Sequence, residues 1–153
     1  MKIISHRGYL DGENEIQENN PIYIDECLSS GFDVEIDLRL NSNKIYLGHD
    51  IEKYSISIDW ILERKEFLWV HCKDIYSIQY LIESKLDINY FWHENDLFTI
   101  TSKNYLWAYP NKRVYQKAVN VLPEKNWGFK KIGEEKIFAI CTDYPKKYRG
   151  IYK

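Results

Sequence analysis

Hydrophobic and polar positions alternate most regularly between Phe32 and Leu40, with the period of two expected of a β-strand. The apolar face of this strand carries Val34, Ile36, Leu38 and Leu40. The polar face carries Asp33, Glu35, Asp37 and Arg39. Two carboxylates two residues apart on a rigid strand are typical of a site for a hard cation. A solvated acidic strand face has the same pattern, so the strand by itself leaves both readings open.

Elsewhere, strands and helices are predicted to alternate in the first half of the chain. Each helix follows a capping residue, and the expected ranges are Asn20–Gly31, Ile58–Arg64 and Ile75–Lys85. Further strands are expected over Lys2–Ser5, Lys44–Leu47, Phe67–Lys73, Ile88–Trp92, Tyr105–Tyr109, Ala118–Leu122 and Lys136–Cys141. No amphipathic helix is predicted from Leu97 to Glu135. The pattern favours an α/β fold with a parallel sheet that lacks helices in its C-terminal half.

Composition narrows the class of protein. A length of 153 residues is typical of one domain, here residues 1–153. The formal net charge of −2 argues against a generic binder of nucleic acid or anionic membranes. The basic segment from Lys146 to Lys153 is expected to be a solvated tail. No leader peptide and no apolar run long enough to span a membrane are expected, which favours a cytoplasmic location.

Cysteine and aromatic content add two expectations. Cys27, Cys72 and Cys141 form no CxxC pair, which predicts buried free thiols rather than a zinc site or disulfides. Aromatic residues make up 16% of the chain, which suits strands and the walls of a sugar or base pocket. Trp127 and the run from Trp107 to Pro110 are interpreted as core aromatics, with a sugar platform as the alternative.

The histidines carry the chemistry. His6, His49, His71 and His93 all lie at or near the end of a predicted strand. Because the carboxyl ends of parallel strands form the functional face of α/β folds, these side chains are expected to converge with Glu35, Asp37 and Lys73.

These residues also form an ordered series of motifs. His6-Arg7-Gly8 is followed by Glu18-Asn19, by Gly31-Phe32-Asp33-Val34-Glu35-Ile36-Asp37 and by Gly48-His49-Asp50. The series resembles the glycerophosphodiester phosphodiesterase family, whose TIM barrel is related to that of phosphatidylinositol phospholipase C. Lys73 resembles the lysine that ends that family's next strand motif, and Thr142-Asp143-Tyr144-Pro145 resembles its TD-x-P. The strong part of the resemblance covers residues 3 to 50.

The resemblance implies a fold and a set of roles. The fold would be a reduced (β/α) TIM-like barrel with helices missing in the C-terminal half. His6 and His49 would be the general acid and base, and Arg7 and Lys73 would hold the phosphate. Glu35 and Asp37 would bind Mg²⁺ or Ca²⁺. Glu18 would orient the loop or Arg7 at the substrate site, and His93 would contact substrate or lie in a surface loop.

Three departures from the family pattern matter. His71 stands where the family has a third metal carboxylate, which makes Mn²⁺ or Zn²⁺ suitable if the imidazole binds the metal. The alternative is that His71 supports a metal held by two carboxylates alone. The insertion that commonly follows the family's HD motif is replaced here by Ile51 to Ile56. Finally, the chain has 153 residues, whereas a TIM barrel typically has about 250.

The leading hypothesis is a metal-dependent phosphodiesterase that hydrolyses a small glycerol-, polyol- or sugar-linked phosphodiester by histidine acid–base catalysis. One alternative is a non-catalytic module that binds a phosphoryl or polyol group. Another is a lyase that releases a cyclic phosphate. The sequence leaves the oligomeric state open.

Overall fold

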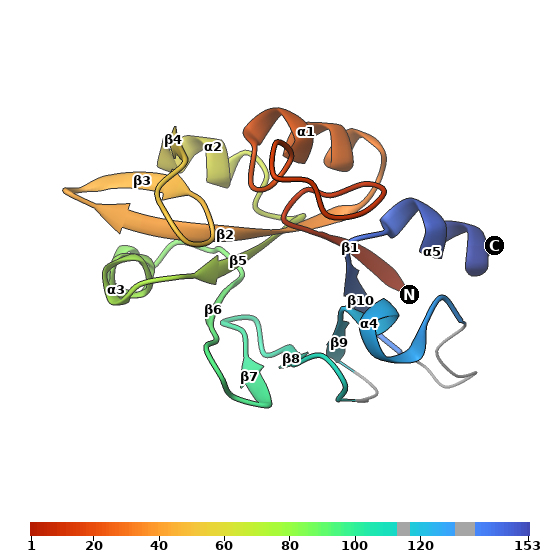
Figure 1. Cartoon of the computed structure of the whole chain (residues 1–153). Coiled ribbons are helices and arrows are strands. Elements are labelled where there is room, and N and C mark those ends of the chain that lie inside the picture. Colours follow the sequence, from red (N-terminus) through yellow and green to blue (C-terminus); the bar gives the residue numbers. More distant parts are fainter. Residues whose placement is uncertain (113–116, 131–136) are drawn as a thin grey trace.

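Ten strands form a single curled, mixed sheet with five short helices in the described part of the chain, residues 1–112, 117–130 and 137–153 of a computed structural model (Figure 1). The strands are β1 (Lys2–His6), β2 (Asp33–Asn41), β3 (Lys44–Leu47), β4 (Tyr54–Ile56), β5 (Leu68–Cys72), β6 (Tyr90–Trp92), β7 (Phe98–Ile100), β8 (Leu106–Ala108), β9 (Ala118–Val121) and β10 (Ala139–Thr142). The helices are α1 (Pro21–Ser29), α2 (Ile58–Leu62), α3 (Ile75–Ser84), α4 (Pro123–Trp127) and α5 (Pro145–Ile151).

The strand order is β4-β3-β2-β1-β10-β9-β8-β7, and β5 pairs with both β2 and β6. The pairs of β1 with β2 and β10, of β5 with β2 and β6, and of β9 with β8 and β10 are parallel. The pairs β2–β3, β3–β4 and β7–β8 are antiparallel. The sheet therefore curls into a half-barrel of mixed direction.

The predicted reduced (β/α) TIM-like barrel is wrong, because the sheet is a curled half-barrel that contains antiparallel pairs. A parallel crossover needs a dozen or more residues and is usually a helix. Only residues 93–97 separate β6 from β7, and only residues 101–105 separate β7 from β8. These connections are too short for crossover helices, so β7 turns back antiparallel to β8.

Most of the predicted elements form where their patterns place them. Asn20 accepts a hydrogen bond from the Ile22 backbone as the N-cap of α1, and Ser57 and Asp74 cap α2 and α3 in the same way. The sequence pattern missed β4, β7, α4 and α5, all of seven residues or fewer. The predicted start of the last strand at Lys136 lies outside the described residues.

The predicted solvated tail is instead the short helix α5. Its Tyr148 is fully buried, and the Arg149 guanidinium lies 3.6 Å from the centre of the Phe32 ring. Arg149 also donates a hydrogen bond of 2.6 Å to the Ser30 carbonyl. The basic residues therefore surround an apolar anchor, which charge patterning alone concealed.

The two faces of the curled sheet pack in different buried clusters. The apolar face of β2, with Val34, Ile36 and Leu38, packs in the cluster that also holds Ile24 of α1, Ile61 of α2 and Leu81 of α3. A second cluster on the other side includes Trp69, Phe91 and Trp107, and its Phe91 and Trp107 rings lie 4.5 Å apart. The predicted burial of Cys27, Cys72 and Cys141 as free thiols is confirmed.

Candidate functional site

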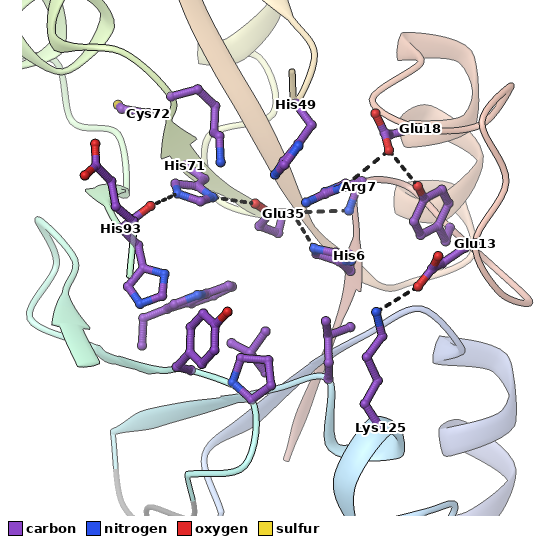
Figure 2. A pocket seen from close by; sticks show the side chains of 18 of the residues that line it. His6, Arg7, Glu13, Glu18, Glu35, His49, His71, Cys72, His93 and Lys125 are labelled. Atoms are coloured by element: carbon purple, nitrogen blue, oxygen red, sulfur yellow. Dashed lines mark hydrogen bonds and ion pairs between the residues drawn. The ribbon is translucent and has the colours of Figure 1, made fainter. Parts of the chain in front are cut away.

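A cleft of about 490 Å³ opens where β1, β5 and β6 end (Figure 2). All four histidines line it, as their positions at strand ends predicted. Arg7, Glu18, Glu35 and Lys73 line it too, whereas Asp37 lies beneath it with no exposed surface. The structure thus brings all the predicted site residues together.

Strand register places the carboxylates next to histidines. In the parallel pairs, Glu35 of β2 lies opposite His6 of β1, and Asp37 lies opposite His71 of β5. His71 Nδ1 lies 3.4 Å from Glu35 Oε1 and 3.3 Å from Asp37 Oδ1. One ligand atom from each of Glu35, Asp37 and His71 lies within 4.8 Å of the others, so the three form a candidate metal group.

The donor set of this group fits a divalent cation. His71 Nε2 bonds the His93 carbonyl at 2.8 Å, which leaves Nδ1 facing the two carboxylates. Metal-binding histidines usually have their second nitrogen fixed in this way. Asp37 Oδ1 is buried and has no well-aligned hydrogen bond. Two oxygens and one nitrogen suit Mn²⁺ or Zn²⁺ as well as Mg²⁺.

Charge around the group is balanced by the chain itself. Burial alone would lower the pKa of His71, but its contacts with Asp37 and Glu35 outweigh burial and raise it to about 9. Burial alone would raise the pKa of Asp37, yet His71, Arg7 and Lys73 hold it well below its usual range. Without a metal, the His71 imidazolium together with Arg7 and Lys73 therefore offsets the charge of the two carboxylates.

This balance predicts a pH-dependent stability for the metal-free protein. The folded pKa of His71, about 9, lies above its ordinary value of 6.5. The folded state therefore binds the proton more tightly, and its extra stability is complete below about pH 6.5 and is lost as the pH rises through about 9. We expect the free energy of unfolding, measured by urea denaturation in the presence of a chelator, to fall by on the order of 3 kcal/mol as the pH rises from 6.5 to 10. The urea midpoint should fall with it.

The His71→Gln variant is the control for this prediction, because it lacks the titrating ring. Its midpoint should change much less between pH 6.5 and 10. A wild-type midpoint that is constant over this range would show that His71 is not a buried imidazolium.

Arg7 contacts carboxylates rather than open solvent. Its Nη1 lies 3.3 Å from Glu18 Oε2 and its Nε lies 3.1 Å from Asp37 Oδ2. The Tyr9 hydroxyl also donates to Glu18 Oε2, at 3.0 Å. Burial would lower the pKa of Arg7, but the carboxylates raise it further, so it stays charged. The predicted orienting contact of Glu18 with Arg7 is present.

Asn19 had no predicted role, although it is part of the Glu18-Asn19 motif. Its side-chain amide donates to Asp37 Oδ2, and its carbonyl accepts from the Asp37 backbone N–H, both at 2.8 Å. This pair of bonds fixes the carboxylate from the loop that precedes α1.

His6 forms a dyad with a carboxylate that sequence reasoning also left unassigned. His6 Nδ1 lies 2.6 Å from Asp143 Oδ1, and Asp143 is buried. The Asp143 backbone is held in turn, because its N–H donates to Glu124 Oε1 at 2.9 Å. The dyad leaves His6 Nε2 on the side of Glu35, 4.0 Å away. The TD-x-P motif was the available indication for Asp143.

The His49 side chain is more exposed than those of His6 and His71. Its Nδ1 lies 2.7 Å from Asp50 Oδ1. Arg39 of β2 donates to the carbonyls of both Gly48 and His49, which fixes the loop. Gly48 has a φ of 151°, and a Cβ there would lie 2.0 Å from the Ile51 carbonyl oxygen, so only glycine fits.

Two lysines reach the cleft from opposite sides. Lys73 Nζ, at the end of β5, lies 3.8 Å from Asp37 Oδ1. Lys125 of α4 pairs with Glu13 at 2.8 Å and lies 3.9 Å from Asp143 Oδ2. Lys125 had no role in the sequence analysis because α4 was not predicted.

The comparisons identify no family. Protein-family models, curated proteins and solved structures give no match to this chain. The resemblance to glycerophosphodiester phosphodiesterases therefore rests on the motif residues alone. Among the described residues, no helix is long and apolar enough to cross a membrane.

Proposed function

We propose that this protein is a metal-dependent phosphodiesterase acting on a small glycerol-, polyol- or sugar-linked phosphodiester. The observation that supports it most strongly is that one cleft holds both the candidate metal group and the dyad of His6 with the buried Asp143. Glu35 belongs to the metal group and also approaches the dyad, because its Oε1 lies 3.4 Å from His71 Nδ1 and its Oε2 lies 4.0 Å from His6 Nε2. Binding alone would need no pair of histidines able to transfer protons.

The chain's residues can share the work of the reaction. Glu35, Asp37 and His71 would hold the cation, whose charge would stabilise the negative charge that develops on the phosphoryl oxygens. Asp143 keeps the proton on His6 Nδ1, so Nε2 can accept a proton from the attacking hydroxyl or water. His49, on the loop after β3, would protonate the leaving alcohol. Lys73 would attract the diester anion.

Arg7 has a narrower role in this proposal than the resemblance implied. Glu18 and Asp37 already engage its Nη1 and Nε atoms. Its guanidinium therefore stabilises the carboxylates, and contact with the phosphate is left to its remaining nitrogen.

A screen of metals against substrates tests the proposal directly. We expect the chelated protein to hydrolyse bis-p-nitrophenyl phosphate or glycerophosphocholine only after Mn²⁺, Mg²⁺, Ca²⁺ or Zn²⁺ is restored. Product analysis by ³¹P NMR separates a hydrolase, which gives a monoester, from a lyase, which stops at a cyclic phosphate. Binding of phosphate esters without turnover under any metal would instead identify a binding module.

A further inference from the structure

The candidate cleft has two chemically different walls. Charged side chains from β1, β2 and β5 form one wall. Six uncharged residues from β6, β8, β9 and the segments after them form the other, with Glu94 and Lys125 beside them: Trp92, Trp107, Tyr109, Pro110, Val121 and Leu122. In Figure 2 a group of rings lies across the cleft from the labelled His6 and Arg7. The proposed chemistry uses only the charged wall.

The uncharged wall, called the ring wall from here on, combines a rigid buried support with an accessible face. Trp107 is buried, and its ring packs 4.5 Å from Phe91 and 6.0 Å from Trp69. Tyr109, two residues further along, is 42% exposed, and its ring lies 5.4 Å from the His93 ring. The Tyr109 backbone is held by a hydrogen bond of 3.0 Å from its N–H to the Leu97 carbonyl. An exposed tyrosine on a rigid support is suited to contact with a ligand.

The His93 ring is held in place beside Tyr109. Its Nε2 bonds the Asp96 carbonyl at 2.7 Å. Its own backbone carbonyl holds His71 of the candidate metal group. The ring wall and the metal group are therefore joined through one residue, so a ligand on the rings lies beside the proposed reaction centre.

Size indicates a ligand larger than glycerol phosphate. The cleft has a volume of about 490 Å³, within the range of about 300–1,000 Å³ that holds drug-sized ligands. The rings stand on one side of the cleft instead of surrounding a point, which suits a flat group better than a compact quaternary ammonium cage. Stacking on aromatic side chains is a general way to bind a nucleobase.

We propose that the ring wall is a subsite for a planar base, so that the substrate is a phosphodiester with a nucleoside as one of its alcohols. This inference rests on the proposed phosphodiesterase function, which places the phosphate on the charged wall. The base would lie against Tyr109 and Trp92, and the second alcohol would point toward the mouth of the cleft. Tyr109 is then the residue that determines specificity for the nucleoside.

Paired probes test the subsite without requiring turnover. AMP carries a base where ribose 5-phosphate has its anomeric hydroxyl, and the dissociation constants of both can be measured by calorimetry with Mn²⁺ present. We expect AMP to bind about tenfold more tightly, in line with one stacked base. The Tyr109→Ala variant should lose this preference and keep its affinity for ribose 5-phosphate, whereas Tyr109→Phe should retain the preference.

Tyr76→Ala is the matched control, because Tyr76 is 66% exposed on α3 and does not line the cleft. It should behave as wild type. Equal affinities for AMP and ribose 5-phosphate would overturn the subsite, as would a preference that survives in Tyr109→Ala. A gain in affinity for octyl phosphate but not for AMP would identify a site for an apolar chain and would also overturn it.

Turnover separates this inference from the function on which it rests. If AMP is preferred but thymidine 5′-p-nitrophenyl phosphate is not cleaved with any metal, the base subsite stands and the phosphodiesterase proposal fails. If simple diesters are cleaved and AMP has no advantage, the phosphodiesterase stands and the subsite fails.

Discussion

Replacement of His6 by alanine should lower kcat on a cleaved phosphodiester by about 10²–10⁴-fold, the usual effect of losing a general acid or base. The reason is its position: Asp143 holds Nδ1 at 2.6 Å, so Nε2 is the nitrogen that faces Glu35 and the cleft. Steady-state kinetics across pH 5 to 9 measure the effect.

Metal affinity is the control for His6→Ala, because His6 is not part of the candidate metal group. Calorimetry should give the wild-type dissociation constant for Mn²⁺. Asp143→Asn should lower kcat as well, by at least about tenfold, since an amide cannot hold the required tautomer as the carboxylate does. Full turnover in both variants would remove the dyad from the mechanism.

The Asp37→Asn variant should show the largest loss of metal binding. Asp37 has no exposed surface, and its Oδ1 points toward His71 and Lys73. An amide removes the negative charge without changing the shape, so we expect the dissociation constant for Mn²⁺ to rise by more than about 100-fold, beyond the effect typical of a lost supporting residue. Calorimetry or metal-dependent tryptophan fluorescence measures it.

Asp33→Asn is a matched control on the same strand. Asp33 is also a buried carboxylate, but it accepts hydrogen bonds from Lys2 at 2.7 Å and Trp69 at 3.0 Å and lies outside the metal group. Its substitution should leave metal affinity unchanged. If Asp37→Asn binds Mn²⁺ like the wild type while both variants remain folded, the carboxylate pair is not the metal site.

Much of the site could be predicted because its residues lie in short local patterns. The alternation in β2 placed Glu35 and Asp37 on the face opposite the apolar core, and capping residues located α1, α2 and α3. The strand-end positions of the histidines predicted their meeting, since parallel neighbours present their carboxyl ends together. The roles assigned to these residues remain predictions.

The barrel was wrong for a reason that local patterns do not reveal. The family resemblance supplied a parallel barrel, whereas the pairs β2–β3, β3–β4 and β7–β8 are antiparallel and the sheet stays a half-barrel. Short strands of three residues, such as β4 and β7, carry too few positions for their period to be recognised.

The sequence by itself determined the amphipathic β2 strand, the capped helices, the buried thiols and the meeting of the four histidines with Glu35 and Lys73. Periodicity and capping act over a few residues, so they are legible without the fold. Only the tertiary structure decided that Asp143 supports His6 across 137 residues, that Asn19 fixes Asp37, and that a ring wall faces the charged one. These contacts depend on strand order, register and the curl of the sheet, which arise from packing along the whole chain.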